Sequence, residues 1–388
     1  MKADLVTRHQ EKTAREPVFH IVKRGAVDRK WPYLVRIIAI LAALFVCAIL
    51  SVIVTGENPV GIFGAMIKGS FGSVRIFLSL LSDMAILLCI SLAVTPAFKM
   101  RFWNIGAEGQ VLAGGIAAAA CMIYIGKLPF IVLFPIMLLA SVAAGMIWAF
   151  LPAICKAVWG TNETLFTLMM NYIAMQVVRA LETVWEGKKG SGHIGVISNG
   201  RFPKLFNISE LLPILIVAAI VVMMYIYLRY SKHGYEIEVV GESENTARYI
   251  GINVKKVIVR TMLVSGAVCG IAGLLLVAGT DHTISPNTAG GDGFTAIMVS
   301  WLAKFNPLYM ILTTFLLVFL ERGGGEIATQ FKLNPSFPEI LTGVILFFII
   351  GCEFFIRYSI SFTHKRREKL PADAPPSEDS TVKKEDDQ

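Results

Sequence analysis

Long apolar segments alternate with short polar ones along most of the chain. A membrane-spanning helix needs about 20 mostly apolar residues. The segments that we expect to span are, in chain order, 37–56, 76–98, 105–126, 128–155, 163–181, 211–228, 261–280, 293–303, 305–320 and 340–356. The eighth is too brief to span unless 284–291 contributes to it. The pattern therefore predicts an all-α polytopic membrane protein with about ten transmembrane helices.

The composition supports this interpretation. Hydrophobic residues make up 55% of the chain and charged residues only 16%, whereas a soluble globular protein carries about 25% charged residues. The mean hydropathy is +0.64. A soluble enzyme or a nucleic-acid binder is excluded, so the net charge of +8 indicates contact with membrane lipid and not with nucleic acid.

The charges concentrate at the two ends of the chain. Residues 1–32 form a basic N-terminal tail, 33–360 hold the transmembrane domain, and 361–388 have the proline and charge content of a disordered tail. An even number of spans places both tails on one side. Because Lys and Arg gather on the cytoplasmic side of membranes, we expect both termini in the cytoplasm and the chain in the bacterial inner membrane.

Catalytic and metal-binding motifs are absent from the sequence. The six cysteines are scattered singly in apolar stretches, and neither C-x-x-C nor H-E-x-x-H occurs. No G-x-x-x-x-G-K-[ST] occurs either, so the chain lacks the loop that holds ATP phosphates in P-loop proteins. We therefore predict no catalytic residue, no metal site and no cofactor bound by this chain.

Polar residues interrupt the third predicted span at its start. Asn104, Glu108 and Gln110 alternate with glycines at the edge of an apolar run. Such residues are costly in lipid and are tolerated where the backbone lines a cavity or packs against protein. Two interpretations remain open: a broken helix start that faces a translocation path, or close helix packing through small residues.

Two further segments carry polar groups into predicted spans. Gly291-Asp292-Gly293 repeats the pattern of an acid beside glycine, and paired interruptions in two halves of a chain are typical of internally repeated transporters. Asn162 begins the fifth span, and Thr167 and Asn171 follow at a spacing that places them on one helix face. A substrate path and plain hydrogen bonding between helices are equally compatible with this face.

A short helix is predicted in the largest internal cytoplasmic loop. Ser243 is a good N-cap, Glu244 is an acid in the first turn, and Gly251 is a good stop. A helix of two turns is marginal alone in water, so it should dock against something. Either a soluble partner or the helix bundle itself is compatible with the pattern.

These same residues resemble a known family, the membrane permease subunits of bacterial ABC importers for ribose-type sugars, nucleosides and branched-chain amino acids. The matching motifs are Phe102–Gln110, Gly160–Glu163, Leu168–Ile173, Ala247–Ile252 and Ser265–Gly273. They resemble most the nucleoside and simple-sugar branch. The resemblance covers roughly residues 35–357.

The resemblance implies a permease fold of about ten helices that pairs with a second permease, identical or paralogous. Cytosolic ATPase subunits would dock on a coupling loop at about 231–256 and use the ATP, while an extracytoplasmic binding protein would deliver a nucleoside or simple sugar. The implied ATPase contact comprises Gly241, Glu242, Ser243, Glu244, Ala247, Arg248, Tyr249 and Gly251. The implied substrate path comprises Asn104, Glu108, Gln110, Asn162, Thr167, Asn171 and Asp292.

Two alternatives belong to other classes of protein. A secondary transporter driven by an ion gradient would use the carboxylates of Asp83, Glu108, Asp292 and Glu353 as proton or sodium relays. An intramembrane enzyme would need a nucleophile with a base, or a metal set, and the sequence offers neither.

Overall fold

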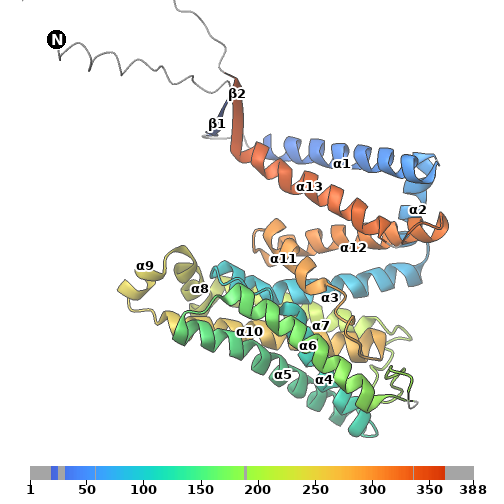
Figure 1. Cartoon of the computed structure of the whole chain (residues 1–388), viewed down its shortest axis with the longest axis vertical. Coiled ribbons are helices and arrows are strands. Elements are labelled where there is room, and N and C mark those ends of the chain that lie inside the picture. The colour runs from blue at the N-terminus through green and yellow to red at the C-terminus, as the bar shows by residue number, and fades with distance from the viewer. Residues whose placement is uncertain (1–18, 25–30, 57, 188–189, 335, 363–388) are drawn as a thin grey trace, which may run out of the picture. The chain divides into compact units, whose positions relative to one another are not determined.

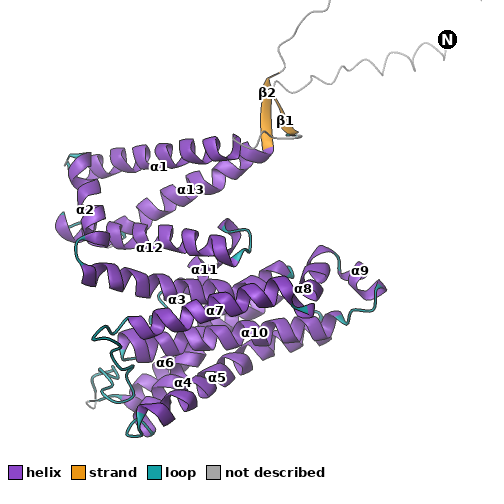
Figure 2. Cartoon of the chain, turned by 180° about the vertical axis from the view of Figure 1, so that it is seen from behind, coloured by secondary structure: helices purple, strands orange, loops and turns teal. Residues whose placement is uncertain are grey.

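The structure is a computed structural model that describes residues 19–24, 31–56, 58–187, 190–334 and 336–362. Almost all of this part is helical (Figures 1 and 2). The elements in chain order are β1 (Phe19–Lys23), α1 (Trp31–Thr55), α2 (Pro59–Phe71), α3 (Val74–Lys99), α4 (Ala107–Tyr124), α5 (Phe130–Trp159), α6 (Glu163–Trp185), α7 (Leu211–Tyr230), α8 (Lys232–Glu242), α9 (Glu244–Tyr249), α10 (Val254–Leu274), η2 (Leu275–Asp281), α11 (Asp292–Leu302), α12 (Pro307–Gln330), α13 (Phe337–Arg357) and β2 (Tyr358–Phe362).

Nine helices within the described ranges are long and apolar enough to cross a membrane. They correspond to nine of the ten predicted spans, with η2 continuing α10, and the prediction of an all-α polytopic protein is confirmed. Several helices run past their predicted ends and include charged residues, of which Arg322 and Arg260 are paired with carboxylates. The helix α12, for example, continues to Gln330 and so includes Arg322, which the pattern placed beyond the span.

The eighth predicted span is shorter than a membrane is thick. The helix α11 has 11 residues, which at 1.5 Å per residue is about 16 Å, roughly half the apolar layer. The preceding segment 284–291 forms turns and does not extend the helix. Gly290 and Gly291 have φ of 57° and 88°, a left-handed conformation that ends helical geometry. The eighth element is therefore a half-helix.

The chain divides into two compact units, one formed by residues 43–347 and the other by 1–42 with 348–388. In the larger unit, α10 packs against both α4 and α5, which also contact each other. Small residues allow this approach: a Cβ on Gly266 would lie 2.6 Å from that of Ala149 and would also meet the Gly145 carbonyl. Close approach through glycine is a common way for helices to pack in membranes.

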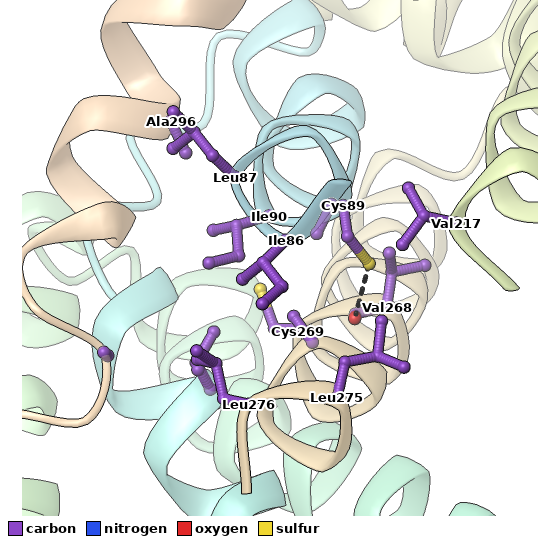
Figure 3. Packing of buried hydrophobic residues seen from close by; sticks show 14 of the residues in the cluster. Ile86, Leu87, Cys89, Ile90, Val217, Val268, Cys269, Leu275, Leu276 and Ala296 are labelled. Atoms are coloured by element: carbon purple, nitrogen blue, oxygen red, sulfur yellow. Dashed lines mark hydrogen bonds between the residues drawn. The ribbon is translucent and has the colours of Figure 1, made fainter. Parts of the chain in front are cut away.

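The buried centre of the larger unit lies where α3 meets α10 and η2. Figure 3 shows Ile86 and Ile90 of α3 directed toward Cys269 and Leu276, and Cys89 directed toward Val268. The Cys89 thiol donates to the carbonyl of Val268 at 3.7 Å (Figure 3). The described cysteines are all free thiols.

The smaller unit contains a two-stranded antiparallel sheet made from both ends of the chain. Phe19 of β1 pairs with Phe362 of β2, and Lys23 pairs with Tyr358. The sequence pattern predicted disorder from residue 361 onward, whereas Ser361 and Phe362 lie in β2. This strand forms by backbone pairing with residues more than 300 positions earlier, and the local composition cannot predict such a pairing. The remainder of the predicted tails, 1–18 and 363–388, lies outside the described residues.

Candidate functional site

The loop before α4 is organised around the side chain of Asn104, which is fully buried. Its Oδ1 accepts hydrogen bonds from the Gly106 backbone N–H at 3.1 Å and from Gln110 Nε2 at 3.2 Å. Its Nδ2 donates to Ser265 Oγ of α10 at 3.1 Å. One amide thus bonds polar groups at the start of α4 and joins them to α10. These hydrogen bonds offset the cost of burying the polar groups in an apolar bundle.

The helix α6 is attached to the same loop by two buried side chains. Asn171 donates from Nδ2 to the carbonyl of Ile105 at 2.9 Å and accepts from the Gly109 N–H at 2.9 Å. Thr167 Oγ1 accepts from the Ile105 N–H at 3.2 Å. A Cβ on Gly109 would lie only 3.0 Å from Asn171 Oδ1, so glycine permits this bond.

Glu108 joins the two segments whose sequences resemble each other. Its two carboxylate oxygens accept the backbone N–H groups of Gly291 and Gly293, each at 2.9 Å. These are N-terminal donors of α11, which have no partner within the helix. A carboxylate at this end also interacts favourably with the helix dipole. The sequence showed two similar motifs, and the structure places one against the other.

The predicted path residues therefore fall into three groups. Asn104, Glu108, Gln110, Thr167 and Asn171 form one buried network, which we call the α4 network together with Ser265. Asn162 stands apart at the start of α6, where its side chain accepts the Leu165 N–H at 3.2 Å and borders an apolar groove along that helix. Asp292 lies at the start of α11 and lines a separate cavity.

This cavity, of about 540 Å³, lies among α2, α3, η2, α11 and α12. We call it the acidic cavity and define it by six charged lining residues: Asp83, Asp281, Asp292, Glu321, Arg322 and Glu326. Arg322 forms an ion pair with Asp83 and donates to Ser79 Oγ at 2.7 Å. Most of this site escaped the sequence analysis because Glu321, Arg322 and Glu326 lie past the predicted end of their span.

The formal charge of the acidic cavity is negative. Five carboxylates face one guanidinium among its lining residues. His282 follows Asp281 directly, and burial, followed by the nearby positive Arg201, lowers its pKa from the usual value, so His282 adds no charge at neutral pH. Within the described residues no group of three His, Cys, Asp or Glu side chains is arranged to hold a metal ion.

The predicted short helix in the internal loop is present as α9, six residues long. Ser243 caps it by accepting the Thr246 N–H at 3.2 Å, and Gly251 follows it with a φ of 87°. Arg248 and Glu244 pair at 3.0 Å on the surface. Tyr249 is 93% exposed, so the helix presents a large aromatic ring to its surroundings.

The short helix is fixed from beneath by a small core. Ala247 is fully buried against apolar residues of α8 and α10, including Ile237, Val257 and Met262. Gly241 of α8 approaches the end of α3 so closely that a Cβ would meet the Lys99 carbonyl. The segment 241–251 is thus attached to two membrane helices and is exposed on its other side.

Comparison with known proteins agrees with this architecture. Residues 76–350 match the family described as the permease component of branched-chain amino acid transport systems. The match covers well over half of the chain, and the protein belongs to this family of multi-pass membrane permeases.

Individual relatives are ABC transporter permeases. The chain is 28% identical to a glucose ABC transporter permease of Haloferax volcanii over 90% of this chain and 96% of the relative. It is 28% identical to a guanosine ABC transporter permease of Bacillus subtilis over 89% of this chain and 99% of the relative. A nucleoside ABC transporter permease of Lactococcus lactis is 26% identical over 81% and 90%.

Proposed function

We propose that this chain is the permease subunit of an importer that carries a nucleoside, or a simple sugar, into the cytoplasm across the inner membrane. The observation that carries the proposal is the α8–α9 segment. A capped six-residue helix packs against α8 and α10 and exposes Tyr249. A surface that receives force from another protein needs this combination of attachment and exposure. The relatives described above include guanosine, nucleoside and glucose permeases, which supports the solute class.

A cytosolic ATPase is the partner that this surface fits. The sequence has no P-loop, so the ATP is bound and hydrolysed on another chain. Closure of that ATPase would move α9 as a rigid body, and the attachment of Gly241 to the end of α3 and of Ala247 to α10 would carry the movement into the membrane. The contact comprises residues 241–251.

The topology that we propose places α8, α9 and both termini in the cytoplasm. A second permease subunit and an extracytoplasmic binding protein complete the importer. The α4 network holds the half-helix α11 in place, and Asp292 at its first turn faces the solute path. On this topology α11 extends from near the middle of the membrane to the cytoplasmic side, where Trp301 stacks on Trp103 with ring centroids 5.8 Å apart.

An ion-gradient mechanism has less support at two of its four candidate carboxylates, Asp83 and Glu108. The Asp83 carboxylate is paired with Arg322, and both oxygens of Glu108 accept backbone N–H groups. A proton or sodium relay needs carboxylates that can exchange their partners, and these two are already engaged.

Reconstitution into vesicles tests the proposal. The chain, copurified with its ATPase and supplied with its binding protein, should take up guanosine or glucose only when ATP is present. Arg248→Glu together with Gly251→Pro should abolish uptake, because the first reverses a surface charge and the second cannot adopt the φ of 87° at Gly251. The surface substitution Lys204→Glu, remote from α9 in sequence and in an outer loop, is the control. Uptake driven by a proton gradient without ATP, or normal uptake in the double variant, would overturn the proposal.

A further inference from the structure

The acidic cavity is lined mainly by acceptors of hydrogen bonds. Its one guanidinium already serves Asp83 and Ser79. The Thr280 hydroxyl donates to the carbonyl of Leu276 at 2.9 Å, and the Thr329 hydroxyl donates to that of Gly325 at 2.9 Å. Both hydroxyls have thus used their proton and can only accept a further hydrogen bond. An occupant of this cavity must therefore supply several donors.

Asp292 provides an independent indication that something binds there. It is half-buried at the first turn of α11 and lines the cavity. The backbone N–H groups of its neighbours Gly291 and Gly293 donate to Glu108. The start of α11 therefore does not need the Asp292 side chain as a hydrogen-bond acceptor. Within the described residues the Asp292 carboxylate has no hydrogen-bond or ion-pair partner, and a half-buried carboxylate is stabilised by a donor that it lacks here.

The positions of the carboxylates indicate which kind of occupant the cavity suits, a metal ion or a solute with hydrogen-bond donors. A metal ion would draw three or more ligands to one point, and no such group occurs in the described part of the chain. The carboxylates instead come from four elements, α3, η2, α11 and α12, around the cavity. The same cavity is also lined by the apolar residues Ile86, Leu87 and Val318. A lining of both carboxylates and apolar side chains suits a solute that carries hydroxyl groups on a carbon skeleton.

We propose that the acidic cavity binds the polyhydroxylated part of the transported solute, the ribose of a nucleoside or the ring of a simple sugar. Two adjacent hydroxyls can donate to the two oxygens of one carboxylate, and the C–H faces of the sugar can contact the apolar residues of the lining. The volume of about 540 Å³ lies within the usual range for small-molecule sites, about 300–1,000 Å³. The inference rests on the function proposed above and assigns Asp292 and Glu321 as the principal acceptors.

Thiol protection measures occupancy of the cavity without requiring transport. In a Thr329→Cys variant, the introduced thiol lies at the exposed edge of the cavity and reacts with a water-soluble maleimide; the unsubstituted chain gives the background. The copurified complex is labelled without ATP and without binding protein.

Saturating guanosine, or D-glucose, should slow labelling about tenfold, and 2′,3′-dideoxyguanosine should not. Adding Glu321→Gln or Asp292→Asn should remove the protection.

The control is Glu182→Gln, the same change of carboxylate to amide on α6, which lies outside the cavity and should keep protection. Equal protection by guanosine and by its dideoxy analogue, protection by neither guanosine nor D-glucose, or protection that survives both cavity substitutions would overturn the inference. The ATP-dependent uptake assay reports separately on the proposed function. Uptake without hydroxyl-dependent protection would refute the cavity assignment alone, whereas protection without ATP-dependent uptake would refute the importer.

Discussion

A single carboxylate, that of Glu108, closes the N-terminal end of α11 inside the apolar bundle. Half-helix termini in transporters often point at a solute or an ion. Here both oxygens of Glu108 accept backbone N–H groups, so the terminus is already occupied by the protein itself. At the scale of residues, the acid of one motif stabilises the backbone of the other, and Asp292 is left to face the cavity.

This geometry predicts the effect of Glu108→Gln. A glutamine has one acceptor oxygen, so either the Gly291 or the Gly293 N–H would lose its partner, at a cost of about 1–3 kcal/mol. We expect faster hydrogen exchange of the peptide that contains the start of α11, and a lower free energy of unfolding in detergent. Exchange unchanged from that of the parent chain, with Glu182→Gln as the reference substitution, would show that the bond does not hold α11.

At the scale of elements, the contact of α10 with α5 depends on glycine. A Cβ on Gly266 would come within 2.6 Å of the Ala149 Cβ and would also press on the Gly145 carbonyl. Gly266→Ala should therefore destabilise the protein by about 1–3 kcal/mol despite alanine's better helix propensity. Gly64→Ala in α2, where an added Cβ meets nothing within 4 Å, should be neutral or stabilising. Thermal unfolding in one detergent compares the two, and equal midpoints would contradict the packing argument.

The short helix α9 offers a second test at this scale. Ser243 supplies its N-cap, and loss of such a cap costs about 1 kcal/mol, which is large for a helix of six residues. Ser243→Ala should loosen α9 and reduce solute-stimulated ATP hydrolysis by the assembled complex, whereas Ser243→Asn keeps a capping oxygen and should retain the activity. If the alanine variant matches the asparagine variant, the rigidity of α9 does not contribute to coupling.

The sequence predicted some of these elements better than others. The ends of α9 follow from local chemistry at Ser243 and Gly251, and the structure places both as expected. The sequence singled out the other residues of the α4 network as polar groups at the start of a span or on one helix face, with a substrate path and helix packing both left open. Their bond to Ser265 was not predicted, because a serine in an apolar helix carries no distinctive pattern. The acidic cavity was largely missed, since Glu321 and Arg322 looked like the end of a span until Asp83, over 200 residues earlier, supplied the partner.

At the scale of the whole molecule, the half-helix α11 determines on which side of the membrane the chain after it begins. Nine full spans alone, an odd number, would put the two ends of the transmembrane domain on opposite sides of the membrane. If the turn segment before α11 and the helix itself together complete a tenth crossing, both ends lie on one side. The basic residues that flank the first and last spans favour the second arrangement.

Cysteine accessibility in intact cells distinguishes these two arrangements. Asn287 is exposed in the segment before α11, and Lys304 is exposed just after the helix. The two positions are 17 residues apart, and this stretch can cross the apolar layer only if the turns before α11 contribute to its length. We expect the thiol of Asn287→Cys to react with an impermeant maleimide added outside, and that of Lys304→Cys to react only after the cells are opened. Ser191→Cys, in the loop after α6, provides the outside reference. Labelling of both positions from the same side would make α11 a re-entrant helix. It would also invert α12 and α13 and move the C-terminal end of the chain to the outer face, so the tails could not share the cytoplasmic side with α9.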